Sequence, residues 1–315
     1  NTINAMGVDG PMAGADVLVY ALQDYLDNAS SAESLLLEPS VTDSVTARAD
    51  GLRLVNDAGD GPFLIVVRAN GSTTDLTTGA FPVISEVKTI VKEATTNRIY
   101  ATPLTTLAVE MAMHEKTSAE KVVEAMGIGR VGAVAHLGFG MSFDIDIFSV
   151  PPVLDETTQP LDMQVQVSEY RTATEVFAAI VDQLVNDNNF ADHETAFAEI
   201  VSDALDEQID DAAIQAAIAS VNATFLNDSG RLDQTIDSLL IRENTGLSHD
   251  IGIPITFAPS PSYAEVFSLS PLSSIASSTN DFDLDGVVDS EDNCVNTPNP
   301  DQADNGGINS VVADG

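Results

Sequence analysis

The pattern of apolar and polar positions changes near residue 100. Before that point, short runs rich in Val, Leu and Ile at residues 17–22, 52–55 and 63–67 are separated by Gly, Asp and Asn. Short apolar runs bounded by turn residues are typical of β-strands. The pattern therefore predicts that residues 1–98 form a β-domain.

After residue 100, the apolar positions follow a helical period. Thr102 is a natural N-cap, Pro103 takes the first helical position, and apolar residues then recur every three or four positions. Further helices are predicted to start at Thr117, Thr172, Asp192 and Asp210, and a last one to cover residues 232–240. Gly127 is expected to end the helix that starts at Thr117. Together these stripes predict an α-helical bundle over residues 99–245.

Residues 246–280 are rich in Pro and Ser and predict a connector. Within it, residues 251–257 are apolar enough for one strand, although Pro254, Pro259 and Pro261 disfavour a central one. We expect such a strand to return to the β-domain or to pair with a neighbouring molecule. The N-terminal residues 1–8 are a second candidate for such intermolecular pairing.

The strongly negative net charge of the chain limits which classes of molecule are expected to bind it. The 315-residue sequence has 49 Asp and Glu against 12 Lys and Arg, a net charge of −37, which excludes nucleic acid and anionic membranes as expected partners. No apolar run approaches the roughly 18 residues of a membrane span. The lack of an initiator Met and of a signal peptide predicts a mature N-terminus after cleavage, or a fragment. The acidity suits a secreted protein in calcium-rich or salt-rich water.

Candidate chemistry gathers near the C-terminal end, where Asp recurs at alternate positions before Gly286. Calcium prefers roughly six to eight oxygen ligands, which short Asp side chains on a tight turn supply. The expected ligands are Asp281, Asp283, Asp285, the carbonyl of Val287, Asp289 and Asp292. The spacing matches an EF-hand loop with Asp in place of the final Glu, but the flanking residues are poor helix formers, so no EF-hand is expected. A solvated acidic tail is the alternative.

Residues 281–304, with Asp-Asn-Cys and then Asn-Pro-x-Gln-x-Asp after the alternating acids, resemble a thrombospondin type 3 repeat. That family implies a calcium-dependent extracellular stalk that wraps around its ions and has little regular secondary structure. The resemblance adds Asn299, Asp301 and Asp304 to the expected ligands. The sequence departs from the family at residues 305–308, where further alternating aspartates are missing.

Cys294, the single cysteine, lies inside this run. The resemblance implies that it forms a disulfide within the stalk, with a partner beyond Gly315. From the residues alone, a free thiol is the alternative.

Two more resemblances concern the rest of the chain. Residues 7–17, a Gly-Pro turn followed by a Gly-Ala-x-Val strand, resemble the first hairpin of carboxypeptidase-regulatory-like and Ig-like β-sandwich modules. Residues 102–108, 125–128 and 143–146 look like a helical module that follows Ig-like domains in bacterial surface proteins. Both resemblances imply spacers, assembly units or binding platforms. The expected fold is multidomain α+β: an antiparallel β-sandwich at residues 1–98, an α-helical domain at 99–245, the connector at 246–280 and the calcium-binding repeat at 281–315.

Catalytic constellations are not evident in the sequence. Residues 127–132 spell the dinucleotide fingerprint Gly-x-Gly-x-x-Gly, but a predicted helix precedes them where a strand is required. The four histidines, His114, His136, His193 and His249, are not spaced as zinc ligands. Paired acids such as Asp144 and Asp146 are expected on solvated faces. We therefore expect a protein that is not an enzyme.

The resulting hypothesis is a calcium-binding structural or adhesive protein, secreted by or displayed on the cell surface of a bacterium. Such a protein could be a subunit of an extracellular fibre. Its expected partners are calcium ions and either further copies of itself or another surface protein. The alternative is a glycan- or protein-binding module of a larger secreted protein or enzyme. That alternative predicts a concave patch with an exposed aromatic ring, the tyrosine candidates being Tyr20, Tyr100, Tyr170 and Tyr263.

Overall fold

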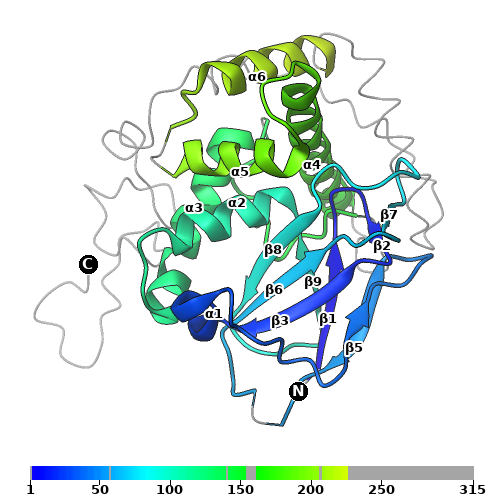
Figure 1. Ribbon diagram of the computed structural model, residues 1–315, viewed down its shortest axis with the longest axis vertical. Helices are drawn as coiled ribbons and strands as arrows, with labels where there is room; N and C mark the ends of the chain where they lie inside the picture. The colour runs from blue at the N-terminus through cyan, green and yellow to red at the C-terminus, as the bar shows by residue number, and fades with distance from the viewer. Residues whose placement is uncertain (1, 57, 140, 154–160, 206–207, 226–315) are drawn as a thin grey trace, which may run out of the picture. The chain divides into compact units, whose positions relative to one another are not determined.

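The described part of the chain, residues 2–56, 58–139, 141–153, 161–205 and 208–225 of a computed structural model, is mixed α+β (Figure 1). Its strands are β1 (Thr2–Gly7), β2 (Met12–Ala13), β3 (Asp16–Ala21), β4 (Ser40–Val41), β5 (Arg48–Arg53), β6 (Phe63–Arg68), β7 (Thr74–Asp75), β8 (Glu86–Val91) and β9 (Arg98–Ala101). Its helices are α1 (Leu22–Asn28), α2 (Pro103–Met113), α3 (Ala119–Leu137), α4 (Leu161–Asn186), α5 (His193–Ala204) and α6 (Ala212–Phe225). The predicted connector at 246–280 and the predicted repeat at 281–315 lie outside the described residues.

The strands form a four-stranded sheet in the order β4-β3-β6-β8, a three-stranded sheet in the order β5-β1-β9, and the small pair β2-β7. The four-stranded sheet is antiparallel throughout. In the other sheet, β1 is antiparallel to β5 but parallel to β9, so the purely antiparallel expectation is wrong there. The reason is that β9 follows β1 only after all the other strands, so no hairpin turn sets their relative direction.

Strand β1 lies at the centre of its sheet and is paired along both edges within its own chain. The expectation that residues 1–8 pair with a neighbouring molecule is therefore wrong for this strand. Two isolated bridges add to the pairing: Leu36, in the loop before β4, pairs with Leu54 just after β5, and Lys88 of β8 pairs with Thr102 just after β9.

The four-stranded sheet is buried on both faces, which explains why β6 is a continuous apolar run. On one face, Phe63, Ile65 and Val67 belong to the main core. On the other face, Leu64 and Val66 pack in a second cluster with residues of α1, α2 and α3. Alternation of side chains along the strand sends successive residues into these two cores.

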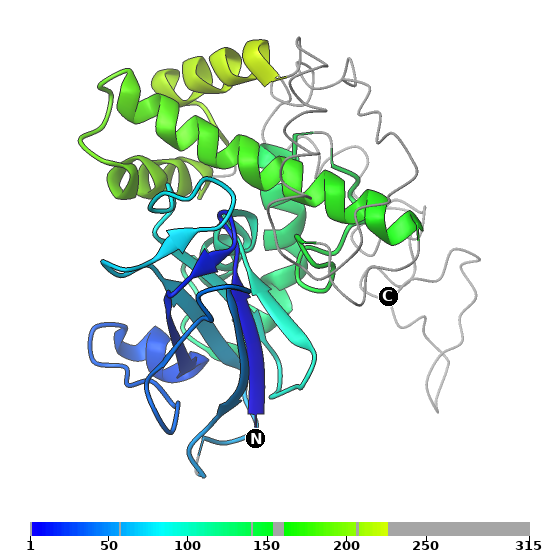
Figure 2. The ribbon, with the colours of Figure 1, turned by 90° about the vertical axis from the view of Figure 1, so that its right-hand side faces the viewer.

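The main core contains residues of both the strands and the helices, from Ile3 of β1 to Ile214 of α6. Figure 2 shows α4, α5 and α6 lying together on one side of the strands. The predicted domain boundary between residues 98 and 99 falls inside β9, whose residues pair with β1. The predicted division therefore runs through a paired strand and a shared core.

Helix starts were predicted with mixed success. The Thr102 cap of α2 is confirmed, with reciprocal bonds to Thr105, and the Asp192 side chain caps α5. The predicted start at Thr117 is one residue early, because the Ser118 hydroxyl makes the capping bond. Likewise Asp211, and not Asp210, accepts from the first amides of α6. Thr172 lies inside α4, because the helix already begins upstream at Leu161.

Gly127 does not end its helix, since α3 continues to Leu137. The stretch from Gly127 to Gly132 is therefore helical and is not the strand-to-helix loop that a dinucleotide site requires. The buried Gly129 has a packing role instead: a Cβ there would lie 2.3 Å from the carbonyl oxygen of Ala108 in α2. The glycine permits α2 and α3 to approach closely.

Replacing Gly129 with Ala should lower the free energy of unfolding by about 1–3 kcal/mol, because the helices must separate to admit a methyl group. Helix propensity alone predicts the opposite sign, a gain of up to about 1 kcal/mol. Gly127→Ala is the matched control, because Gly127 is exposed on the same helix and should show that gain. Urea unfolding of both variants measures the difference, and equal stabilisation by the two would contradict the packing role.

Candidate functional site

The predicted calcium ligands cannot be placed in the fold. Asp281, Asp283, Asp285, Val287, Asp289, Asp292, Asn299, Asp301 and Asp304 all lie outside the described residues, as does Cys294. Within the described ranges, His, Cys, Asp and Glu form no group of three or more that could hold a metal ion. None of the helices described there is long and apolar enough to cross a membrane.

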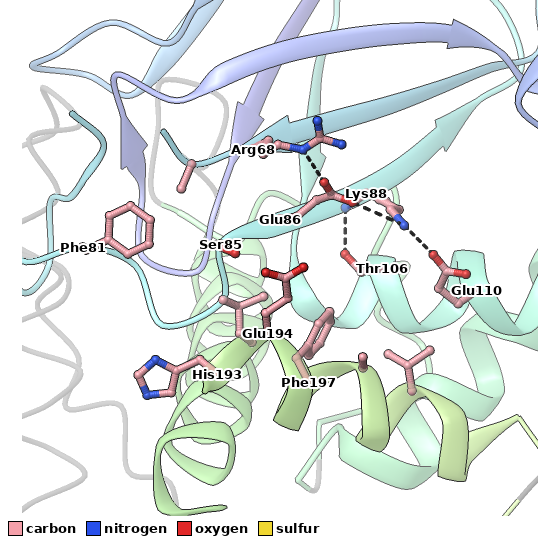
Figure 3. Close-up of a pocket in the computed structure, with 14 residues that line it drawn as sticks. Arg68, Phe81, Ser85, Glu86, Lys88, Thr106, Glu110, His193, Glu194 and Phe197 are labelled. Carbon is pink, nitrogen blue, oxygen red and sulfur yellow. Dashed lines mark hydrogen bonds and ion pairs between the residues drawn. The ribbon is translucent and has the colours of Figure 1, made fainter. Parts of the chain in front are cut away.

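The structure instead brings together a groove that the sequence did not indicate (Figure 3). It lies between β8 and α5, residues of α2 also line it, and its volume is about 620 Å³. We call it the β8–α5 groove. Its lining residues are Arg68, Ala69, Phe81, Ile84, Ser85, Glu86, Lys88, Thr106, Glu110, His193, Glu194, Phe197, Ala198 and Val201. A volume of this size is typical of small-molecule and short-peptide sites.

Charges on the β8 side of the groove are largely paired with one another. Arg68 Nε lies 2.5 Å from Glu86 Oε2, while Lys88 Nζ lies 2.7 Å from Glu110 Oε1 and 3.4 Å from Glu86 Oε1. Burial acts to lower the pKa of Lys88, but Glu110, together with Tyr25 and Glu86, outweighs burial and raises that pKa above its ordinary value. Lys88 therefore stays charged, and the network holds this wall in place.

The α5 side of the groove is more apolar. Phe197 packs against Phe177 of α4, with ring centroids 5.5 Å apart, so its ring is fixed. Figure 3 shows Glu194 and Phe197 pointing from α5 toward β8, with Phe81 at the left end of the groove. Phe81 is 54% exposed, which is unusual for a large apolar side chain and leaves its ring free to contact a ligand.

Behind Ile84, one residue of the groove wall, lies a group of buried ionisable side chains. Asp9 is 2% exposed, and its Oδ2 accepts the Ile84 amide at 3.0 Å. Arg171 of α4 is also buried, and its guanidinium lies 2.9 Å from Glu175. Burial raises the pKa of Asp9 to about 8, and the nearby carboxylates of Glu175 and Asp75 add to this effect.

The Glu175 side chain is 18% exposed, and burial raises its pKa to about 7 despite the neighbouring Arg171 charge. Perturbed acids are common at functional sites, but ion-pair networks inside a fold produce them too. Here they connect the β2–β7 region to α4. We therefore treat them as structural support for the groove wall.

Other residues singled out from the sequence have ordinary roles. Tyr100 and Tyr170 are buried, so neither offers an exposed ring, and Tyr20 lies partly buried beside Tyr25. The Tyr170 hydroxyl lies 2.8 Å from the Thr102 hydroxyl, within hydrogen-bond distance, and donates a hydrogen bond to the Ile147 carbonyl. Tyr263 and His249 lie outside the described residues.

Among the histidines in the described part of the chain, His193 lines the groove, and its Nε2 lies 3.0 Å from Asp182 Oδ1. The groove residues themselves were missed in the sequence. A usable signal was the Glu-x-Lys alternation at Glu86 and Lys88, which is typical of a strand with one face exposed to solvent.

No family model, curated protein or solved structure matches the chain. The geometry of the groove, with mixed apolar and charged walls, suits the binding of a ligand.

Proposed function

We propose that the protein is a secreted or surface-displayed calcium-binding protein with a structural or adhesive role. The observation that carries the proposal is the spacing of acids, Gly and Asn-Pro over residues 281–304. So many carboxylates close together repel one another unless a cation lies between them. Calcium is the cation whose preferred ligands and coordination number fit this set.

In the proposed arrangement, the mixed α+β part is projected or joined to its neighbours by the calcium-stiffened residues 281–304. The proposed β-sandwich and helices would be projected together, because the described strands and helices share one core. A net charge of −37 favours an extracellular medium with abundant divalent cations, which screen or bridge acidic surfaces.

Calcium should promote self-association of the full chain if it is a fibre subunit. Electron microscopy and light scattering in calcium should reveal assemblies that a chelator disperses, because calcium both orders the acidic run and offsets the net charge. Sodium chloride at matched ionic strength is the control for simple screening. A protein that stays monomeric at high concentration in calcium would exclude the fibre and leave the adhesive form of the proposal.

A second candidate function is a binding module for a glycan or another protein. The β8–α5 groove favours it, because a fixed Phe197 ring and the exposed Phe81 lie beside paired charges in a cavity of about 620 Å³. Concave sites of this composition are characteristic of ligand binding.

A further inference from the structure

We propose that the β8–α5 groove binds an extended peptide segment of a partner protein, in which apolar and basic side chains alternate. The peptide adds a short strand at the edge of β8 and presses its apolar side chains against α5. This inference rests on the second proposed function, the binding module, and is independent of the calcium site.

The backbone of β8 provides the first argument. Strand β8 is an edge of its sheet, with β6 on its inner side. The Lys88 amide donates to Thr106 Oγ1 and its carbonyl accepts from Thr105 Oγ1, both at 2.7 Å, so Lys88 faces away from β6. The Ser85 carbonyl accepts from the Ala69 amide, so Ser85 faces toward β6.

Alternation along a strand then places the amide and carbonyl of Glu86 on the outer side, facing the groove. Thr105 and Thr106 of α2 occupy the main-chain groups of this edge at Lys88. The groove lies next to the uncovered part of the edge, at Glu86. Main-chain groups at a sheet edge are the usual docking points for an extended peptide. The exposed stretch is short, about 10 Å, which suits three or four peptide residues.

The α5 wall of the groove, across from β8, explains why the preferred peptide sequence contains apolar residues. Phe197, Ala198 and Val201 lie on one face of α5 and line the groove across from β8. An extended peptide paired with β8 directs every second side chain toward this face. A groove between an edge strand and a helix thus selects alternate apolar residues, with the exposed Phe81 closing one end.

The charges that line the groove explain why the preferred peptide sequence contains basic residues. Arg68, Glu86, Lys88 and Glu110 neutralise one another in their network. Glu194 takes no part in that network, is exposed, and points into the groove. The groove therefore carries one surplus negative charge, on a chain whose net charge is −37. A Lys or Arg side chain on the peptide complements both the surplus negative charge of the groove and the negative net charge of the chain.

The test measures binding of a fluorescent acetyl-Val-Lys-Val-Lys-Val-amide peptide to the full chain by fluorescence anisotropy. Glu194→Gln should weaken binding about three- to tenfold. Glu199→Gln is the matched control, because Glu199 is exposed on the same helix, is outside the groove lining, and loses the same charge. Ala198→Trp, which fills the groove from an exposed position, should weaken binding at least tenfold. A peptide with Asp in place of Lys, and one with N-methylated amides, should bind more weakly than the parent.

Three results would overturn the inference: no binding of the parent peptide, equal binding by the Glu194 and Glu199 variants, or no effect of Ala198→Trp. A soluble glycan panel separates the inference from the function beneath it. If a glycan bound, Ala198→Trp blocked its binding, and the peptide did not bind, the groove would be a binding site for glycans. That result would support the binding module and contradict the peptide inference. If the protein bound neither the peptide nor any glycan, the proposed function as a binding module would be contradicted as well.

Discussion

Asn in place of Asp9 should make the folded protein more stable at pH 8 by about 3–5 kcal/mol, and should change its stability little at pH 4. Asp9 is buried, and burial raises its pKa to about 8 in the fold. The Asn side chain keeps an oxygen for the Ile84 amide but carries no charge into the interior. Its amide group needs an acceptor of its own, which offsets part of the gain.

The direction of the pH dependence follows from the raised pKa. An unfolded Asp loses its proton near pH 4, whereas folded Asp9 holds it until about pH 8. The stabilising contribution is therefore complete below pH 4 and is lost as pH rises to about 8, at up to about 1.4 kcal/mol per pH unit.

Urea unfolding of the wild type and the variant at several pH values between 4 and 9 measures this difference. Asp60→Asn, at an exposed position, is the matched control and should behave as the wild type does. The buried role of Asp9 would be contradicted by a variant whose stability falls with pH as steeply as that of the wild type.

Features set by local chemistry could be predicted from the sequence. The apolar runs at residues 17–22 and 63–67 correspond to β3 and β6, because Val, Leu and Ile between turn residues favour strands in almost any context. The start of α2 was predicted because Thr102 and Pro103 both act within one helical turn.

Features set by distant contacts could not be predicted. The helix was predicted to end at Gly127, whereas α3 continues, and Gly129 within it lies against the carbonyl of Ala108 in α2, a contact with no local signature. The parallel pairing of β1 with β9 depends on a long connection that has no local signature. The groove joins β8 to α5, and only the packing of α5 against α4 and α2 brings Glu194 and Phe197 opposite Glu86.

Removing two of the predicted ligands should abolish calcium binding. Asp283→Ala combined with Asp285→Ala takes away two adjacent side-chain oxygens, leaving too few to complete a shell of roughly six to eight. The double variant Asp24→Ala/Asp60→Ala removes the same charge from exposed positions in the described fold and should bind as the wild type does. It separates loss of ligands from a change in net charge.

Calorimetric titration of calcium into the full wild-type chain, beside these two double variants, tests the central claim most directly. The calcium-binding proposal predicts saturable heat for the wild type, with a dissociation constant of about 1 mM or tighter, and the same for the control. It predicts no saturable heat for Asp283→Ala/Asp285→Ala. A wild type without saturable heat, or a ligand variant that binds as tightly as the wild type, would contradict the assignment of residues 281–304 as a calcium site.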